Sequence, residues 1–183
     1  MNLTPEMMEL FTAVEMSPPT EHRMTVCYGF RCQRRMELNF TAAERAMLMT
    51  RLAKGKSSPA DERKAIQQAF VWFDRRVGEA VGTAKRVANA DIRTLDAEHN
   101  FDCWDTTRNE VSLLLIFQEW GALRHHTVSD PRYRGNILVG QLPHNTAVIS
   151  EKVGGAKWVV DMWPTAYGQV PDVMTLDKWL DEI

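Results

Sequence analysis

Hydrophobic residues recur at helical spacing in three segments of the N-terminal half. Thr4 and Pro5 are residues favoured at a helix N-cap and first turn, and they predict a helix to about residue 15. Thr41 and Glu44 have the capping-box spacing, which predicts a helix to about residue 53. Ser58 and Pro59 begin another helix. Its apolar face is expected to carry Ile66, Ala69, Phe70, Phe73 and Val77.

The strongest helical pattern covers residues 103–120 and ends before Gly121. Its apolar positions are nearly contiguous, so we expect this helix to be buried on most sides. Residues 78–101 lack a clear period and are expected to be mainly loop. Strands are predicted at residues 123–128, 145–149 and 157–161, with a loop over 130–140 and a short terminal helix after Thr175. Helices followed by one helix with strands indicate an α+β fold with an antiparallel sheet.

Composition is ordinary for a globular protein, with 44% hydrophobic and 25% charged residues. We expect one domain over residues 1–183, in which residues 1–20 form a helical arm and residues 58–183 the core that carries the chemistry. A net charge of −2 without a basic block argues against nucleic acid as a partner, and no segment is apolar enough to span a membrane. The N-terminus lacks a signal-peptide pattern, which favours the cytoplasm, or the periplasm or exterior if a leader has been removed.

Cys27 and Cys32 flank Gly29 and Phe30, a pair suited to a two-residue hairpin turn. Such a turn would place the two cysteines opposite each other and within disulfide reach. Buried thiols are the plainest interpretation, a disulfide the second, and a zinc site with His22 the third.

Cys103 is expected to begin the long helix, and His144 and Asp161 are expected on two later strands. A thiol is a good nucleophile only as thiolate, and both a helix N-terminus and a nearby imidazole favour that form. If the β-hairpin loop between the two strands has an even number of residues, His144 and Asp161 lie on one face of the sheet. The sequence therefore permits a nucleophile, a base and a carboxylate that orients the base.

Further residues are candidates for the same site. The backbone N–H of Cys103, with Asn100 or Trp72 as a second donor, is the candidate oxyanion hole. The candidate cleft residues are Asp102, Trp104, Asp105, His126 and Trp163. His125 and His126 point to opposite faces of a strand, so both cannot join His144 at one metal ion, and no metal site is predicted.

The segments Asp102-Cys103-Trp104-Asp105, His144-Asn-Thr-Ala-Val-Ile and Trp158-Val-Val-Asp161 resemble the signature of transglutaminase-like members of the papain-like superfamily. The resemblance covers about residues 66–164 and is nearest to the bacterial transglutaminase-like cysteine proteinases. It implies a core in which the nucleophile helix packs on a small antiparallel sheet, here with extra N-terminal helices. It also implies attack on a peptide or amide carbonyl and a covalent acyl-enzyme. Asp102 matches one acid of the pattern, but Trp104 stands where a second is expected, which leaves the associated calcium site in doubt; otherwise no cofactor is expected.

Three functions follow from these residues. The first is a cysteine hydrolase or acyl transferase with a protein or peptide substrate. The second is a catalytically inactive binding module of the same fold, in which Trp104 caps the cleft. The third is a redox or metal-sensing domain based on Cys27 and Cys32.

Overall fold

In the computed structural model, residues 1–93 and 96–182 are described, and they form an α+β fold. The α-helices of the described residues are α1 (Pro5–Thr12), α2 (Ala42–Leu52), α3 (Pro59–Val81), α4 (Cys103–Glu119) and α5 (Leu176–Asp181). The strands are β1 (Arg23–Tyr28), β2 (Arg34–Asn39), β3 (His126–Arg134), β4 (His144–Glu151), β5 (Lys157–Asp161) and β6 (Asp172–Thr175). None of the described helices is both long and apolar enough to span a membrane.

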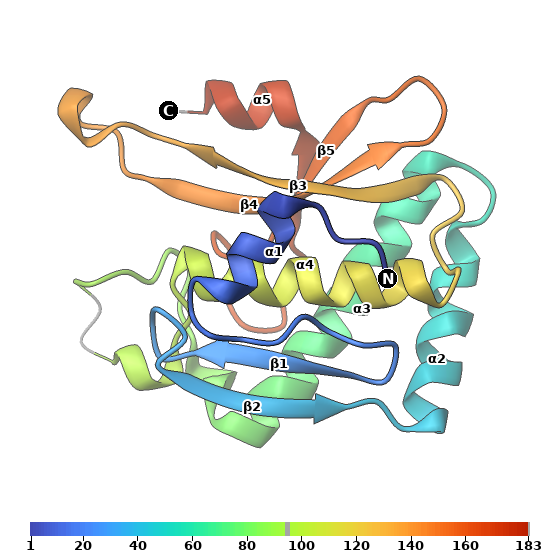
Figure 1. Ribbon diagram of the computed structural model, residues 1–183, viewed down its shortest axis with the longest axis horizontal. Coiled ribbons are helices and arrows are strands. Elements are labelled where there is room, and N and C mark those ends of the chain that lie inside the picture. Colours follow the sequence, from blue (N-terminus) through green and yellow to red (C-terminus); the bar gives the residue numbers. More distant parts are fainter. Residues whose placement is uncertain (94–95, 183) are drawn as a thin grey trace.

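Helix α4 lies at the centre of the molecule, between the β1–β2 hairpin and a four-stranded antiparallel sheet in the order β3-β4-β5-β6 (Figure 1). Every residue of α4 from Asp105 to Phe117 is buried. Helix α3 crosses behind α4, and α5 covers the opposite face of the sheet (Figure 1). One hydrophobic cluster joins residues of α1, β1, α3, α4 and β4. Segments from both ends of the chain therefore share the core that holds α4.

Local signals account for the ends of several helices. Thr4, Thr41 and Ser58 each accept a hydrogen bond from a backbone N–H in the first turn of the following helix, and the Thr41–Glu44 capping box is complete. A helix start needs such acceptors because its first N–H groups have no partner within the helix. Helix α1 ends at Thr12, before residue 15, and α3 continues to Val81 within the stretch expected to be mainly loop.

The predicted loop over residues 130–140 is wrong in its first half, because β3 continues through Pro131 to Arg134. The β3–β4 register shifts between Ser129 and Arg132, which marks a bulge. Strand β3 is at the edge of the sheet. Proline is tolerated at edges and bulges because its missing N–H deprives no neighbouring strand of a donor. Strand β6 was not predicted.

The hairpin turn at Gly29 and Phe30 is also wrong, because Tyr28 pairs with Arg34 and five residues form the loop. Gly29, Phe30, Arg31 and Cys32 all have positive φ angles, a conformation that turn propensities do not suggest for three consecutive non-glycine residues. Hydrogen bonds from this loop to the start of α4 hold it in place, as described below.

Candidate active site

His144 and Asp161 meet where β4 and β5 lie side by side, and Cys103, at the start of α4, contacts Asn145, the residue after His144. Among the described residues, no hydrogen bond joins Nδ1 of His144 to the Cys103 sulfur. Cys103 is the first residue of α4, His144 begins β4, and Asp161 ends β5. The β4–β5 register pairs Ser150 with Lys157, so an even number of residues, 151–156, separates these paired positions. His144 and Asp161 consequently share a face of the sheet, which is the face with Val148 and Val159 that α5 covers.

His144 is tightly held. Its Nε2 atom lies 2.6 Å from Oδ2 of Asp161, and both side chains are buried. Trp163 and Trp179 flank the imidazole, with ring centroids 4.5 Å and 5.5 Å from its own. Nδ1 of His144 is buried and has no hydrogen-bond partner. With Nε2–H donated to the carboxylate, Nδ1 carries the lone pair and is the atom available to take a proton.

Asp161 binds more than the histidine. Its Oδ2 atom also accepts a hydrogen bond from Nε1 of Trp179 at 3.1 Å, and its Oδ1 atom accepts one from the N–H of Trp163 at 3.2 Å. These donors hold the carboxylate in a fixed orientation. Trp179 was missed from the sequence, and no local signal links α5 to residues 144 and 161.

Cys103 is the one cysteine outside a disulfide, and it is partly buried. Burial and the charge of Asp102 raise the pKa of its thiol to about 12, although the N–H groups of Asn145 and of Cys103 itself lower that pKa. The sequence-based expectation of a thiolate favoured by the helix start therefore omits the larger opposing effects. The sulfur lies beside the N–H of Asn145, the residue that follows His144. A hydrogen bond of 3.3 Å from Nδ2 of Asn145 to the Cys103 carbonyl joins the same two segments.

Asp102 and Asp105 connect the start of α4 to the β1–β2 hairpin. Asp102 caps α4 through the N–H of Asp105 at 2.7 Å and accepts the N–H of Arg31 at 2.8 Å. Asp105 accepts the N–H of Cys32 at 2.6 Å and is fully buried. Both acids are thus bound to backbone donors, which gives each a structural role.

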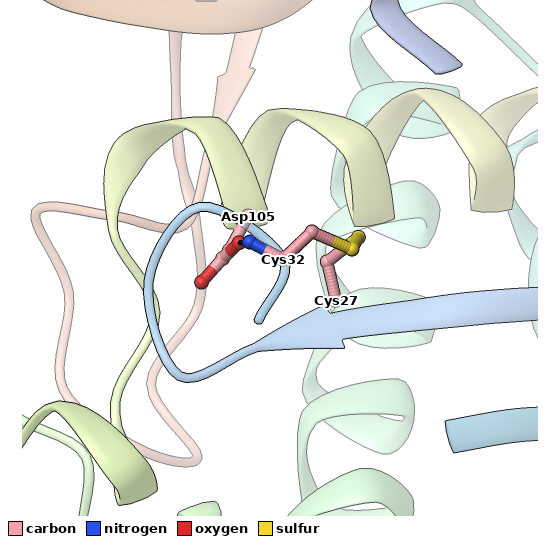
Figure 2. Close-up of side chains that lie close together, drawn as sticks. All are labelled: Cys27, Cys32 and Asp105. Carbon is pink, nitrogen blue, oxygen red and sulfur yellow. Dashed lines mark hydrogen bonds between the residues drawn. A yellow bond between two sulfur atoms is a disulfide. The ribbon is translucent and has the colours of Figure 1, made fainter. Parts of the chain in front are cut away.

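Cys27 and Cys32 form a disulfide next to Asp105, with an S–S distance of 1.95 Å (Figure 2). Ligand atoms of these three residues lie within 4.8 Å of one another. Sulfurs joined in a disulfide carry no thiolate to bind a metal, so the cluster is a covalent link in this state. Burial and the charge of Asp102 raise the pKa of Asp105 to about 7, and its Oδ2 atom has no hydrogen-bond partner.

His126, expected as a cleft residue, is instead at the far end of the sheet. It pairs with Glu151, seven residues along β4 from His144, which is roughly 23 Å at the rise of a strand. Its Nδ1 atom lies 2.7 Å from a carboxylate oxygen of Glu62, a buried residue of α3 that also accepts the N–H groups of Arg124 and His125. At this point the inward face of β3 packs against α3, so His126 is a buried core residue.

The remaining candidates are dispersed. The amide of Asn100 is bound within the loop before α4, because it accepts the N–H of Val87 at 2.8 Å and donates to the Asp96 carbonyl at 2.5 Å. The ring of Trp72 packs against Phe40, with centroids 6.4 Å apart. Within the described part of the chain, neither side chain donates a hydrogen bond to Cys103.

Two cavities border the site. One, of about 400 Å³, is lined by His144 and Trp163 together with residues of the two loops around Asn89 and Gly140. The other, of about 670 Å³, is lined by Trp104, Arg108 and one side of α1. Trp104 is 42% exposed at its edge. Trp104, the residue after Cys103, thus lines one cavity, and His144 lines the other.

Neither a protein-family model, nor a curated protein, nor a solved structure matches this chain.

Proposed function

We propose that this chain is a cysteine-dependent hydrolase or acyl transferase that acts on a peptide or amide carbonyl. The observation that carries the proposal is the state of His144: Nε2 is bound to Asp161 at 2.6 Å, and Nδ1 is buried without a partner. The next residue, Asn145, supplies an N–H to the Cys103 sulfur. A base oriented by a carboxylate, and a partly buried thiol that contacts the residue after the base, are the groups that nucleophilic catalysis requires.

The high pKa of Cys103 determines how the reaction would start. A thiol with a pKa of about 12 is neutral at physiological pH, so the sulfur must lose its proton during the attack. As the sulfur attacks the carbonyl carbon, the thiol proton moves to Nδ1 of His144, and Asp161 stabilises the resulting imidazolium. The tetrahedral intermediate then expels the amine, which takes that proton from His144 and leaves an acyl group on Cys103. Water releases the acyl group in hydrolysis, and an amine releases it in transfer.

The fold supports the same proposal. A buried helix that begins with cysteine packs on an antiparallel sheet whose neighbouring strands carry the histidine and the aspartate. This is the arrangement implied by the resemblance to transglutaminase-like enzymes, and we propose that residues 58–183 form such a core. The cavity lined by His144 and Trp163 is the candidate substrate site.

The test is the alkylation of Cys103 by iodoacetamide, followed by mass spectrometry between pH 5 and 9. The disulfide occupies the other cysteines, so Cys103 is the reporting thiol. At pH 7 we expect the protein to react about 10²–10⁴-fold faster than His144→Ala, the range for loss of a general base. His22→Ala removes an exposed histidine and is the matched control, with no change expected. Equal rates for the protein and His144→Ala would overturn the proposal.

A binding module without catalysis is the second candidate. Trp104, 42% exposed beside Cys103, and the cavity of about 670 Å³ that it lines favour this function. The raised pKa of the thiol is consistent with an unreactive cysteine. The alkylation experiment separates the two candidates, because a binding module has no need for reactivity that depends on His144.

A further inference from the structure

Glu110 is a carboxylic acid in the middle of the buried central helix α4, and it is itself fully buried. Its Oε1 atom accepts the N–H of Met162 at 2.6 Å, and its Oε2 atom accepts the N–H of Ala147 at 3.2 Å. One donor belongs to β4 and the other directly follows β5. Glu110 therefore joins the two strands that carry His144 and Asp161.

This bridge lies where the ladder between β4 and β5 ends. Ala147 and Val160 are the last paired residues toward the site, and the Val160 carbonyl accepts a hydrogen bond from the Thr146 hydroxyl at 3.1 Å. Side chains thus replace backbone pairing at this point. Beyond it, the described residues form no further backbone pair between β4 and β5, whereas the Glu110 carboxyl contacts both strand ends.

The same face of α4 also carries the nucleophile. Cys103, Thr107 and Glu110 are spaced by four and three residues, which places them in a row along the helix. The Thr107 hydroxyl donates to the Asn145 carbonyl at 2.9 Å, and the Asn145 side chain donates to the Cys103 carbonyl at 3.3 Å. A single helix face therefore contacts β4 at residues 145 and 147 and the end of β5 at residue 162.

We propose that Glu110 is a positioning residue, which holds the ends of β4 and β5 at the separation that keeps His144 hydrogen-bonded to Asp161. This inference rests on the proposed function. Glu110 touches none of the reacting atoms and acts through the strand ends. A carboxyl group suits the role because it presents two acceptor oxygens to two donors on different strands.

The charges around Glu110 are consistent with this role. Burial and the nearby charge of Asp161 raise its pKa well above the usual value, while the N–H groups of Met162 and Ala147 and the more distant Arg86 lower it. Placing a second carboxyl group close to Asp161 is costly. Its presence at this cost indicates that the bridge has a use that an apolar side chain would not supply.

Glu110→Gln is the informative substitution because it keeps the size of the side chain. The amide oxygen can accept one N–H, but the NH₂ group then faces the second N–H, so one strand end is released. We expect alkylation of Cys103 at pH 7 to slow by about 10–100-fold, since small displacements of reacting groups have effects of this size. The pH dependence of the rate is expected to move toward that of His144→Ala.

Glu62→Gln is the matched control. Glu62 is also a buried carboxylate that accepts backbone N–H groups, here from Arg124 before β3 and from His126 in β3, at the opposite end of the sheet. Both variants are expected to unfold at lower urea concentrations, whereas only Glu110→Gln is expected to change the pH profile of Cys103. An equal loss of stability with an unchanged profile in Glu110→Gln would overturn the inference.

Two further measurements distinguish failure of the positioning role from failure of the proposed function. If Glu110→Gln does not fold, Glu110→Asp shortens the bridge by one methylene group, and the same change of profile is expected; an unchanged profile would count against the inference equally. If His144→Ala leaves the alkylation rate of the parent protein unchanged, the proposed function fails. If His144→Ala slows alkylation and the Glu110 variants do not, only the positioning role fails.

Discussion

Nε1 of Trp179 donates a hydrogen bond of 3.1 Å to Oδ2 of Asp161, the same oxygen that lies 2.6 Å from Nε2 of His144. The C-terminal helix α5 therefore contributes directly to the environment of the candidate base. Trp179 is 1% exposed, and its ring also packs against the imidazole at 5.5 Å between centroids. The orientation of His144 thus depends on a residue 35 positions later in the chain.

We expect Trp179→Phe to lower the free energy of unfolding by about 1.5–3 kcal/mol, the range for a hydrogen bond to a charged group. Most of the aromatic packing remains in this variant, so the loss reports mainly the missing N–H. Urea unfolding followed by circular dichroism measures it. An unfolding free energy equal to that of the parent protein would show that the indole N–H is not needed by Asp161.

We expect Asp161→Asn to slow alkylation of Cys103 at pH 7 by about 10²–10⁴-fold. The amide keeps the shape of the side chain and can still accept one hydrogen bond, but it lacks the charge that stabilises the imidazolium. Alkylation rates from mass spectrometry measure the effect. Asp177→Asn, on the first turn of α5, changes a carboxylate outside the site and serves as the control. A rate within twofold of the parent protein would rule out an orienting role for Asp161.

We expect the double variant Cys27→Ala, Cys32→Ala to lose about 2 kcal/mol of stability, because the disulfide closes a short loop in the unfolded chain. The released loop also includes the N–H donors of Arg31 and Cys32 that bind Asp102 and Asp105. Thermal and urea unfolding of the parent protein, with and without prior reduction under denaturing conditions, give the comparison. A double variant as stable as the oxidised parent would contradict the prediction.

Asp105 is expected to make stability decrease with rising pH. Burial and the charge of Asp102 raise its pKa from 3.8 to about 7, so between these values the folded chain holds a proton that the unfolded chain has lost. Stability from this group is therefore complete below about pH 4 and is lost as pH rises through about 7. Asp105→Asn removes this slope. The difference in unfolding free energy between parent and variant, measured from pH 4 to 8, isolates it from Glu110, which has the same sign.

Structural features that depend on neighbouring residues could be predicted from the sequence. Thr4, Thr41 and Ser58 cap helices at the expected positions, and the apolar run after Cys103 is the buried central helix. The even loop between the strands brings His144 and Asp161 to one face because side chains alternate along a strand. Each of these features depends on residues a few positions apart, so the pattern alone contains the information.

Glu110 is an intermediate case. An acidic residue within a run of apolar helix positions is a signal in the sequence, since buried carboxylates are rare without partners. The sequence alone does not say which partners it has. The N–H groups of Ala147 and Met162 come from segments more than 30 residues later, and only the packing of α4 against the sheet brings them to the carboxyl group.

The sequence by itself determined where the long helix begins, that cysteine opens it, and that histidine and aspartate follow on strands. Tertiary structure alone decided that His126 faces Glu62 and not the thiol, that Asp105 binds the disulfide loop, and that Trp179 binds Asp161. It also set the pKa of Cys103, through burial and the charge of Asp102. The physical reason is range: caps and periodicity act over one or two turns, whereas burial, charge and hydrogen-bond partners depend on which distant segments fill the same space.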